Sequence, residues 1–172
     1  MKINIYYPIF FVGILIFVGI IQASGNTITN TYYGSMWNKT SVGITVDLTD
    51  PEGYKNISGL VPGELNGFVF TDNQALIVGV AGTYKIDWTC SFDGGNNNRY
   101  GIGVSKNYNI ESSRECYAQR TTGSNAIGNV GGTCILSLEI GDTLNFVIDD
   151  EADPISDPSI HQISMNVMRM GP

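Results

Sequence analysis

The chain has 172 residues, which is enough for one domain with a core once an apolar N-terminal stretch is set aside. Its 21 glycines, few basic side chains and many β-branched and aromatic residues favour strands joined by tight turns. The formal net charge is −7, and removal of the first 25 residues takes away only Lys2 and leaves −8. Such a chain repels a phosphate backbone, so composition argues against a nucleic-acid partner.

The N-terminus has the pattern of an export signal. Lys2 precedes an apolar run from Ile5 to Ile21, which we expect to form a hydrophobic helix, and the small residues Ala23 and Gly25 could flank a cleavage site. The competing interpretation is an uncleaved anchor, because 17 apolar residues are at the lower limit for a bilayer of about 30 Å. Both interpretations of residues 1–25 predict a secreted or extracellular protein, attached to a membrane only if this segment is retained.

Residues 26–35 are polar and small, and we expect a linker there, followed by one domain over residues 36–172. The first expected strand alternates, with Val42, Ile44, Val46 and Leu48 on its buried face. It ends at the turn Asp50-Pro51. A Gly-, Pro- and Asn-rich stretch then leads to two short strands within residues 68–82.

The second half of the chain continues the strand pattern. Residues 83–92 alternate cleanly, 93–98 form a turn, and strands are expected at 99–107 and 114–122, followed by a loop over 123–132. Two further strands place Cys134, Leu136, Leu138 and Ile140 inward, and then Leu144, Phe146 and Ile148. The last strand, residues 159–170, has a less regular pattern. Nine or ten short strands without a convincing helix predict an all-β sandwich or jelly roll.

Two segments resemble a known family beyond their composition. "ALIVGVAGTYKIDWTCSF" and "VGGTCILSLEIGDTLNFVIDD", with "GIGVSKN" between them, resemble in order the signatures of C1q/TNF-like jelly-roll domains. "SMWNKTSVGITVDLTD" and the closing "SMNVMRM" look closest to the C1q-like domains of virus and phage structural proteins, although an export signal departs from that subgroup. The resemblance implies a homotrimer around a threefold axis, with loops at one end that bind a protein or glycan on another surface.

Interface and ligand residues follow from that expectation. Trp37, Tyr100 and Tyr117 are candidates for the contact between subunits, and burial in their own subunit is the alternative for each. The expected ligand loops are residues 93–98, residues 121–128 and the acidic stretch 147–158. Their candidate contact residues are Asp93, Asn96, Asn97, Asn98, Thr122, Ser124 and Asn125.

The acidic stretch "VIDDEADPISDP" has two interpretations. Carboxylates are ligands for calcium, and the resemblance includes members that hold calcium near the top of the trimer, which would make Asp149 and Asp150 the metal ligands. The alternative is a solvated connection in which Asp residues cap turns. No cofactor is required, and calcium is the only candidate.

Catalysis has little support in the sequence. His161 is the single histidine and no G-x-S-x-G elbow is present. Neighbouring carboxylates on a strand point to opposite faces, which disfavours a glycosidase pair. We therefore expect a non-enzymatic, extracellular, trimeric binding module; the alternative is a structural virion or filament component, and a glycan-active enzyme is the third hypothesis.

The three cysteines permit one disulfide in an oxidising compartment. Cys116 with Cys134 is the preferred pair and Cys90 with Cys134 the alternative. Sequence alone does not fix the connectivity, and three reduced thiols are also open.

Overall fold

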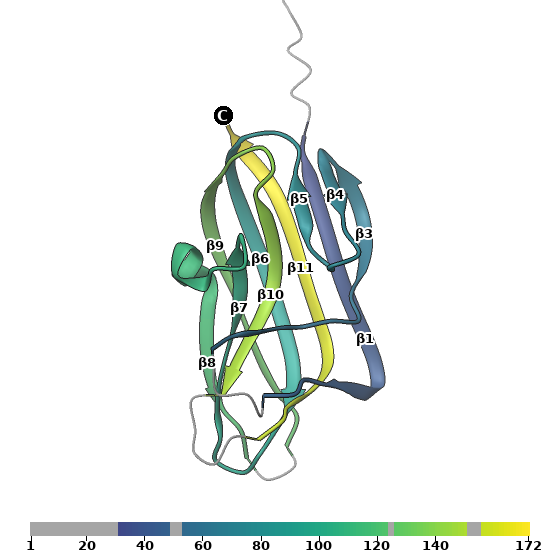
Figure 1. Ribbon diagram of the computed structural model, residues 1–172, viewed down its shortest axis with the longest axis vertical. Helices are drawn as coiled ribbons and strands as arrows, with labels where there is room; N and C mark the ends of the chain where they lie inside the picture. The colour runs from purple at the N-terminus through teal and green to yellow at the C-terminus, as the bar shows by residue number, and fades with distance from the viewer. Residues whose placement is uncertain (1–30, 49–52, 124–125, 151–155) are drawn as a thin grey trace, which may run out of the picture.

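The computed structural model describes residues 31–48, 53–123, 126–150 and 156–172, without the side chains of Thr40 and Ser41. Eleven strands and one short 3₁₀ helix occur in these ranges (Figure 1). In chain order they are β1 (Tyr33–Thr45), β2 (Lys55–Asn56), β3 (Val61–Asn66), β4 (Phe68–Phe70), β5 (Leu76–Val78), β6 (Gly82–Asp93), β7 (Arg99–Lys106), η1 (Ile110–Cys116), β8 (Tyr117–Thr121), β9 (Gly128–Leu138), β10 (Thr143–Asp150) and β11 (Ser159–Gly171).

The strands form two antiparallel sheets packed face to face. Sheet A has the order β3-β1-β11-β6-β9, and sheet B has the order β4-β5-β10-β7-β8, with β2 paired to β10. Neighbours in space are mostly distant in sequence, which is the mark of a jelly roll rather than a meander. The expected all-β sandwich is confirmed.

One continuous core fills the space between the sheets. The expected inward residues of β6, β9 and β10 are buried there, among them Tyr84, Phe92, Cys134 and Phe146. Aromatic pairs link the two layers, with Trp88 against Phe146 at 6.4 Å and Phe92 against Tyr100 at 5.5 Å between ring centroids. Burial of these large rings adds to the stability that the aliphatic core residues provide.

Three expectations about strands are corrected. β1 begins at Tyr33, within the stretch expected to be linker, and Val42 is 85% exposed although its pattern placed it inward. A register shift between Lys39 and Ile44 changes the phase of the strand at that point. Ile140 is 71% exposed because β9 ends before it, at Leu138.

The other corrections concern loops. Residues 128–132 were expected to be a loop, but they pair with β6, with Gly131 opposite Thr89 and Gly132 opposite Trp88. Short strands β2 and β3 and helix η1 were not expected, and they raise the strand number above nine or ten. The irregular last strand is explained by a shift of register between Ile160 and Gln162, after which Ile163, Met165 and Val167 face inward.

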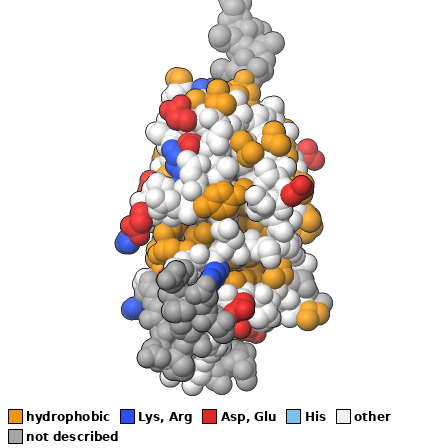
Figure 2. Space-filling model, viewed as in Figure 1, with side chains coloured by type: hydrophobic (Ala, Val, Ile, Leu, Met, Phe, Trp, Pro, Cys, Tyr) orange, Lys and Arg blue, Asp and Glu red, His pale blue; other side chains and the backbone are white. Residues whose placement is uncertain are grey.

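The outer face of sheet B is covered by the chain itself. All residues from Tyr100 to Ser105 in β7, and from Leu144 to Ile148 in β10, are buried, so these strands are enclosed on both faces. The chain between β2 and β3 crosses the near side of the sandwich in Figure 1. Figure 2 shows that this side is mostly uncharged, with hydrophobic side chains in several patches.

Polar contacts hold this cover in place. Ser105 Oγ donates to Asn145 Oδ1 at 2.7 Å, and Asn145 Nδ2 donates to Asn56 Oδ1 at 2.6 Å. Tyr117 packs edge-on against Tyr54, at 5.9 Å between ring centroids, and its phenol lies over Gly101, where a side chain would clash. Tyr117 is therefore half-buried within its own chain.

Helix η1 is tied to both layers. Asn109 caps it by accepting from Glu111 N at 3.0 Å, and Ser113 Oγ donates to Val104 O at 2.8 Å. Seven residues is far below the length needed to cross a bilayer, and no other helix occurs in the part of the chain that the structure describes. The expected N-terminal hydrophobic helix and the 1–25 segment lie outside the described residues.

Candidate functional site

Parts of the three expected ligand loops meet at one end of the sandwich, which we name the loop end: residues 93–98, Thr122 with Gly123, and residues 156–158. Asn97 N donates to Thr122 O at 3.0 Å, and Thr122 N donates to Asn98 O at 2.9 Å. The Thr122 hydroxyl also donates to Gly95 O and to Asn98 O. Backbone hydrogen bonds therefore join the 93–98 loop to the loop that begins at Thr122.

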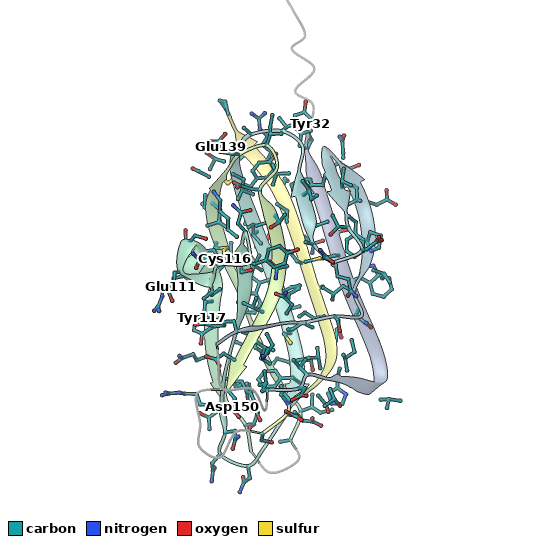
Figure 3. All side chains as sticks on the ribbon, in the orientation of Figure 1. Tyr32, Glu111, Cys116, Tyr117, Glu139 and Asp150 are labelled. Carbon is teal, nitrogen blue, oxygen red and sulfur yellow. A yellow bond between two sulfur atoms is a disulfide. The ribbon has the colours of Figure 1, made fainter. Side chains whose placement is uncertain are left out.

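The acidic stretch is tied to the same loops through Asp150. Its Oδ2 accepts from Asn98 Nδ2 and from Ser156 N, both at 2.8 Å. Tyr100 completes the frame: its hydroxyl donates to Ser156 O at 2.9 Å and accepts from Gly95 N at 3.0 Å. In Figure 3 Asp150 lies at the loop end, and Tyr32 and Glu139 lie at the opposite end.

Burial divides the candidate ligand residues into two groups. Asn98 is 7% exposed and Thr122 is 2% exposed, so their polar groups hold the loops together. Asn96 and Asn97 are exposed, and Asn97 has a positive φ of 65°, a backbone region that asparagine tolerates. Ser124 and Asn125 lie outside the described residues. Among the candidate ligand residues that the structure describes, Asn96 and Asn97 are the ones exposed to a partner.

Asp93 is paired with the only histidine of the chain. His161 Nε2 lies 3.1 Å from Asp93 Oδ2, and both side chains are partly buried. The pair joins the end of β6 to the start of β11. Nearby, Asp157 Oδ1 accepts from Leu48 N at 2.8 Å and fixes the chain that follows β1. These carboxylates have structural partners at the loop end.

The candidate calcium ligands are two neighbouring carboxylates of β10. Asp149 and Asp150 are half-buried neighbours at the end of β10. Within the ranges that the structure describes, no group of three or more His, Cys, Asp or Glu side chains is close enough to hold a metal. Glu151 and Asp153 lie outside those ranges, so calcium binding through Asp149 and Asp150 stays a prediction.

Tyr100 is not a subunit-contact residue, contrary to one of our two expectations. It is fully buried against Phe92 and carries the hydrogen bonds described above. Its side chain points into the core because alternation along β7 places it on the inner face. Trp37, by contrast, is 48% exposed on β1.

The cysteines pair as preferred from the sequence. Cys116, at the end of η1, forms a disulfide with Cys134 of β9, with Cα atoms 5.2 Å apart (Figure 3). Cys90 is a buried free thiol, and burial raises its pKa far above the usual range. A protonated, enclosed thiol is a poor nucleophile, so Cys90 is a core residue.

At the end opposite the loops, the Asp142 carboxylate joins several segments of the chain. Asp142 accepts from Glu139 N and from Asn107 Nδ2, both at 2.7 Å, and pairs with Lys106 Nζ at 2.8 Å. Burial alone would raise the pKa of Asp142, but the hydrogen bonds from Lys106, Glu139 N and Asn107 outweigh it, and the pKa is lowered. Gly141 and Asp142 lie in the turn between β9 and β10, with Gly141 at a φ of 91°.

Comparison with known proteins supports the fold and no more than the fold. No protein-family model matches the chain, and no curated protein matches its sequence. Among solved structures, the chain is similar to Eiger TNF from S. frugiperda, with a TM-score of 0.58 and 12% identity over 82% of this chain and 93% of that one. Murine APRIL matches with a TM-score of 0.53 and 13% identity, over 81% of this chain and 99% of that one.

The globular domain of zebrafish complement 1qA also matches, with a TM-score of 0.53 and 12% identity over 81% of this chain and 97% of that one. These similarities cover both the TNF and the C1q branches of one architecture. The chain therefore has a C1q/TNF-like jelly-roll fold, as its two sequence signatures indicated.

Proposed function

We propose that this protein is a non-enzymatic, extracellular, homotrimeric recognition module that attaches to a protein or glycan on another surface through its loop end. The C1q/TNF-like jelly roll supports the module class. The export or anchor pattern of residues 1–25 supports an extracellular location.

The observation that carries the proposal is the construction of the loop end. Loops that are distant in sequence meet there on a frame made by the buried Tyr100 and Thr122 and the half-buried Asp150. On that frame Asn96 and Asn97 are exposed. Exposed amides donate and accept hydrogen bonds at little conformational cost when the backbone is fixed, as recognition of polar surface groups requires.

A catalytic function has less support. His161 is occupied by Asp93, and the Cys90 thiol is enclosed in the core. The remaining alternative is a structural virion or filament component, in which assembly itself is the function. The sequence resemblance to viral C1q-like domains is the observation that favours it.

The test uses the full chain in a mild detergent. Its mass is measured by light scattering, and its binding is measured on a glycan array, with the double variant Asn96→Ala/Asn97→Ala and a control, Ile140→Ser, beyond the end of β9. We expect three chain masses, and glycan binding that falls by at least about tenfold in the loop variant only. A single-chain mass contradicts the assembly, and binding that survives the loop substitution contradicts the loop assignment. A trimer that binds no glycan and forms ordered filaments favours the structural alternative.

A further inference from the structure

Two acceptor patterns for N-linked glycans occur in the chain: Asn38-Lys39-Thr40 and Asn56-Ile57-Ser58. Such a short pattern arises by chance in many proteins, so the sequence alone does not separate the two. A glycan is much larger than the side chain that it joins, and in the folded protein it needs open space around the asparagine Nδ2 atom. The surroundings of each Nδ2 therefore distinguish the two patterns.

The Asn38 amide is enclosed by the chain. Asn38 is half-buried in β1, and its Nδ2 donates to Gly59 O in the segment between β2 and β3. Gly59 has a positive φ of 80°, and a methyl group in place of its hydrogen would lie 3.1 Å from Asn38 Nδ2. A sugar on this nitrogen would have to displace Gly59. The fold is therefore incompatible with a glycan at Asn38.

The Asn56 amide has the opposite arrangement. Asn56 is exposed at the end of β2, where it pairs with Val147 of β10. Its Oδ1 accepts from Nδ2 of the buried Asn145 at 2.6 Å, so the oxygen of the amide faces the sheet. Nδ2 lies on the other side of the same amide carbon, and it donates to no group within the ranges that the structure describes. The nitrogen that accepts a glycan is therefore presented to solvent.

The hydrogen bond to Asn145 is compatible with a modified Asn56. N-glycosylation replaces one hydrogen of Nδ2 and leaves Oδ1 as an acceptor. Asn145 is itself fixed, because Ser105 Oγ donates to its Oδ1 at 2.7 Å. A glycosylated Asn56 can thus keep its place on sheet B and hold the first sugar in one direction.

The residues beside Asn56 also suit a glycan. Asn56 and Ser58 are exposed, whereas Ile57 between them is 2% exposed and fixes the segment to the core. Tyr54, two residues before Asn56, is half-buried and packs edge-on against Tyr117. The uncovered part of its ring is a flat apolar surface on which the carbon-bound hydrogens of a sugar can lie.

The position of this segment leaves the other layer free. The chain that begins at β2 crosses the outer side of sheet B (Figure 1), a surface that is mostly uncharged and has hydrophobic patches (Figure 2). A glycan there would cover part of that apolar surface. It would not obstruct the outward side of sheet A, which belongs to the other layer of the sandwich.

We propose that Asn56 carries an N-linked glycan and that Asn38 does not. The inference rests on the proposed extracellular location, because only a chain that enters the export route meets the glycosyl transferase. In the transfer, Asn56 Nδ2 forms a bond to the anomeric carbon of a lipid-linked oligosaccharide. The bond from that carbon to the lipid diphosphate breaks, the diphosphate leaves with the bonding electrons, and Nδ2 loses one proton.

The test expresses the full chain in a eukaryotic cell line that glycosylates exported proteins. An acceptor peptide attached after Pro172 is the internal control, because it is modified whenever the chain reaches the transferase. Ser58→Ala removes the pattern and leaves the Asn56–Asn145 hydrogen bond intact, and Ser58→Thr is its matched control because it keeps the pattern. Asn38→Gln removes the other pattern.

Peptide mass spectrometry, before and after enzymatic removal of N-glycans, measures the occupancy of each asparagine. We expect a glycan on Asn56 in the unaltered chain, in Ser58→Thr and in Asn38→Gln, and its complete loss in Ser58→Ala. Circular dichroism checks that Ser58→Ala folds, as expected for a substitution at an exposed position.

The results that overturn the inference differ from those that overturn the proposed function. If the acceptor peptide is modified and Asn56 is not, the inference is wrong and the extracellular location stands. A glycan on Asn38 of the folded, exported chain likewise contradicts the assignment. If neither the acceptor peptide nor Asn56 is modified, the chain is not exported, and the extracellular location falls together with the inference.

Discussion

The two sheets of this sandwich bury their outer faces to different extents. In sheet B, strands β7 and β10 are enclosed on both sides, because Tyr117, Tyr54 and the Asn56–Asn145 hydrogen bond lie over them. In sheet A, the outward side chains of β1, β6, β9 and β11 remain exposed or half-buried. Since the chain covers one sheet and leaves the other bare, the difference indicates which surface is available for assembly.

The largest expected effect separates the two faces directly. Val147, on the outer side of β10, is 3% exposed, whereas Ile135, on the outer side of β9, is 54% exposed. Val147→Asp buries a charge without a partner and is expected to cost about 3–5 kcal/mol of unfolding free energy. Ile135→Asp is expected to change it by about 0.5 kcal/mol or less.

Urea unfolding of both variants, at a dilution where the chain is a single copy, measures this contrast. Equal destabilisation by the two substitutions would show that the faces do not differ.

The second effect concerns the disulfide that joins helix η1 to strand β9 of sheet A. Cys116 and Cys134 are 18 residues apart, and removal of a cross-link over such a loop costs about 3 kcal/mol. Cys116→Ser/Cys134→Ser is expected to unfold at correspondingly lower urea concentration. Addition of a reductant should then lower the stability of the unaltered chain and leave the double variant unchanged; a reductant effect on both would contradict this assignment.

The third effect concerns Asp142, at the end of the sandwich opposite the loops. Asp142→Asn replaces the negatively charged acceptor of three hydrogen-bond donors by a neutral amide. This change is expected to lower the unfolding free energy by about 1–3 kcal/mol at neutral pH. The folded-state pKa of Asp142 is lowered, so its stabilisation is complete above the unfolded-state pKa of about 3.9 and is lost as the pH falls through the folded-state value.

Unfolding curves at pH 7 and at about pH 2 check the sign. The difference between the unaltered chain and Asp142→Asn should shrink at the lower pH. A difference that grows in acid would exclude the stated cause.

The smallest expected effect lies on the outward side of sheet A. Lys85 and Asp87 are 39% and 46% exposed, and an ion pair at such a site contributes about 0–1 kcal/mol to the fold. Lys85→Ala should therefore leave the unfolding free energy of the single chain within about 0.5 kcal/mol. If Lys85→Ala lowered the unfolding free energy of the diluted, single chain by several kcal/mol, the ion pair on the outward side of sheet A would stabilise the fold of one copy, contrary to this expectation.

The sequence was sufficient for the fold class because the inner faces of β6, β9 and β10 alternate with a period of two. It also favoured the Cys116–Cys134 pair, which the structure contains. The errors occur where the register of distant strands determines which way a side chain points or which residues pair. Examples are the shift after Ile160, the exposure of Val42, and the pairing of Gly131 and Gly132 with β6.

Burial on the outer side of β10 could not be predicted either. Asn145 is polar and follows the alternation of a wet face, yet Asn56, 89 residues away, joins it under the cover. Likewise, the alternation of β6 indicated that Lys85, Asp87 and Thr89 face outward. A local sequence pattern does not show whether an outward side chain contacts solvent or a second copy of the chain. That distinction depends on side chains brought together only by the register of four strands.

Hydroxyl-radical footprinting of the full chain at high and low concentration tests the central claim most directly, because it reads the solvent access of individual side chains. The account predicts that Trp37 and Met168, on the outward side of sheet A, are oxidised at low concentration and become protected at high concentration, while Tyr108, between β7 and η1, stays reactive in both. Oxidation of Trp37 and Met168 that does not change with concentration, in a chain that light scattering shows to be assembled, would contradict it.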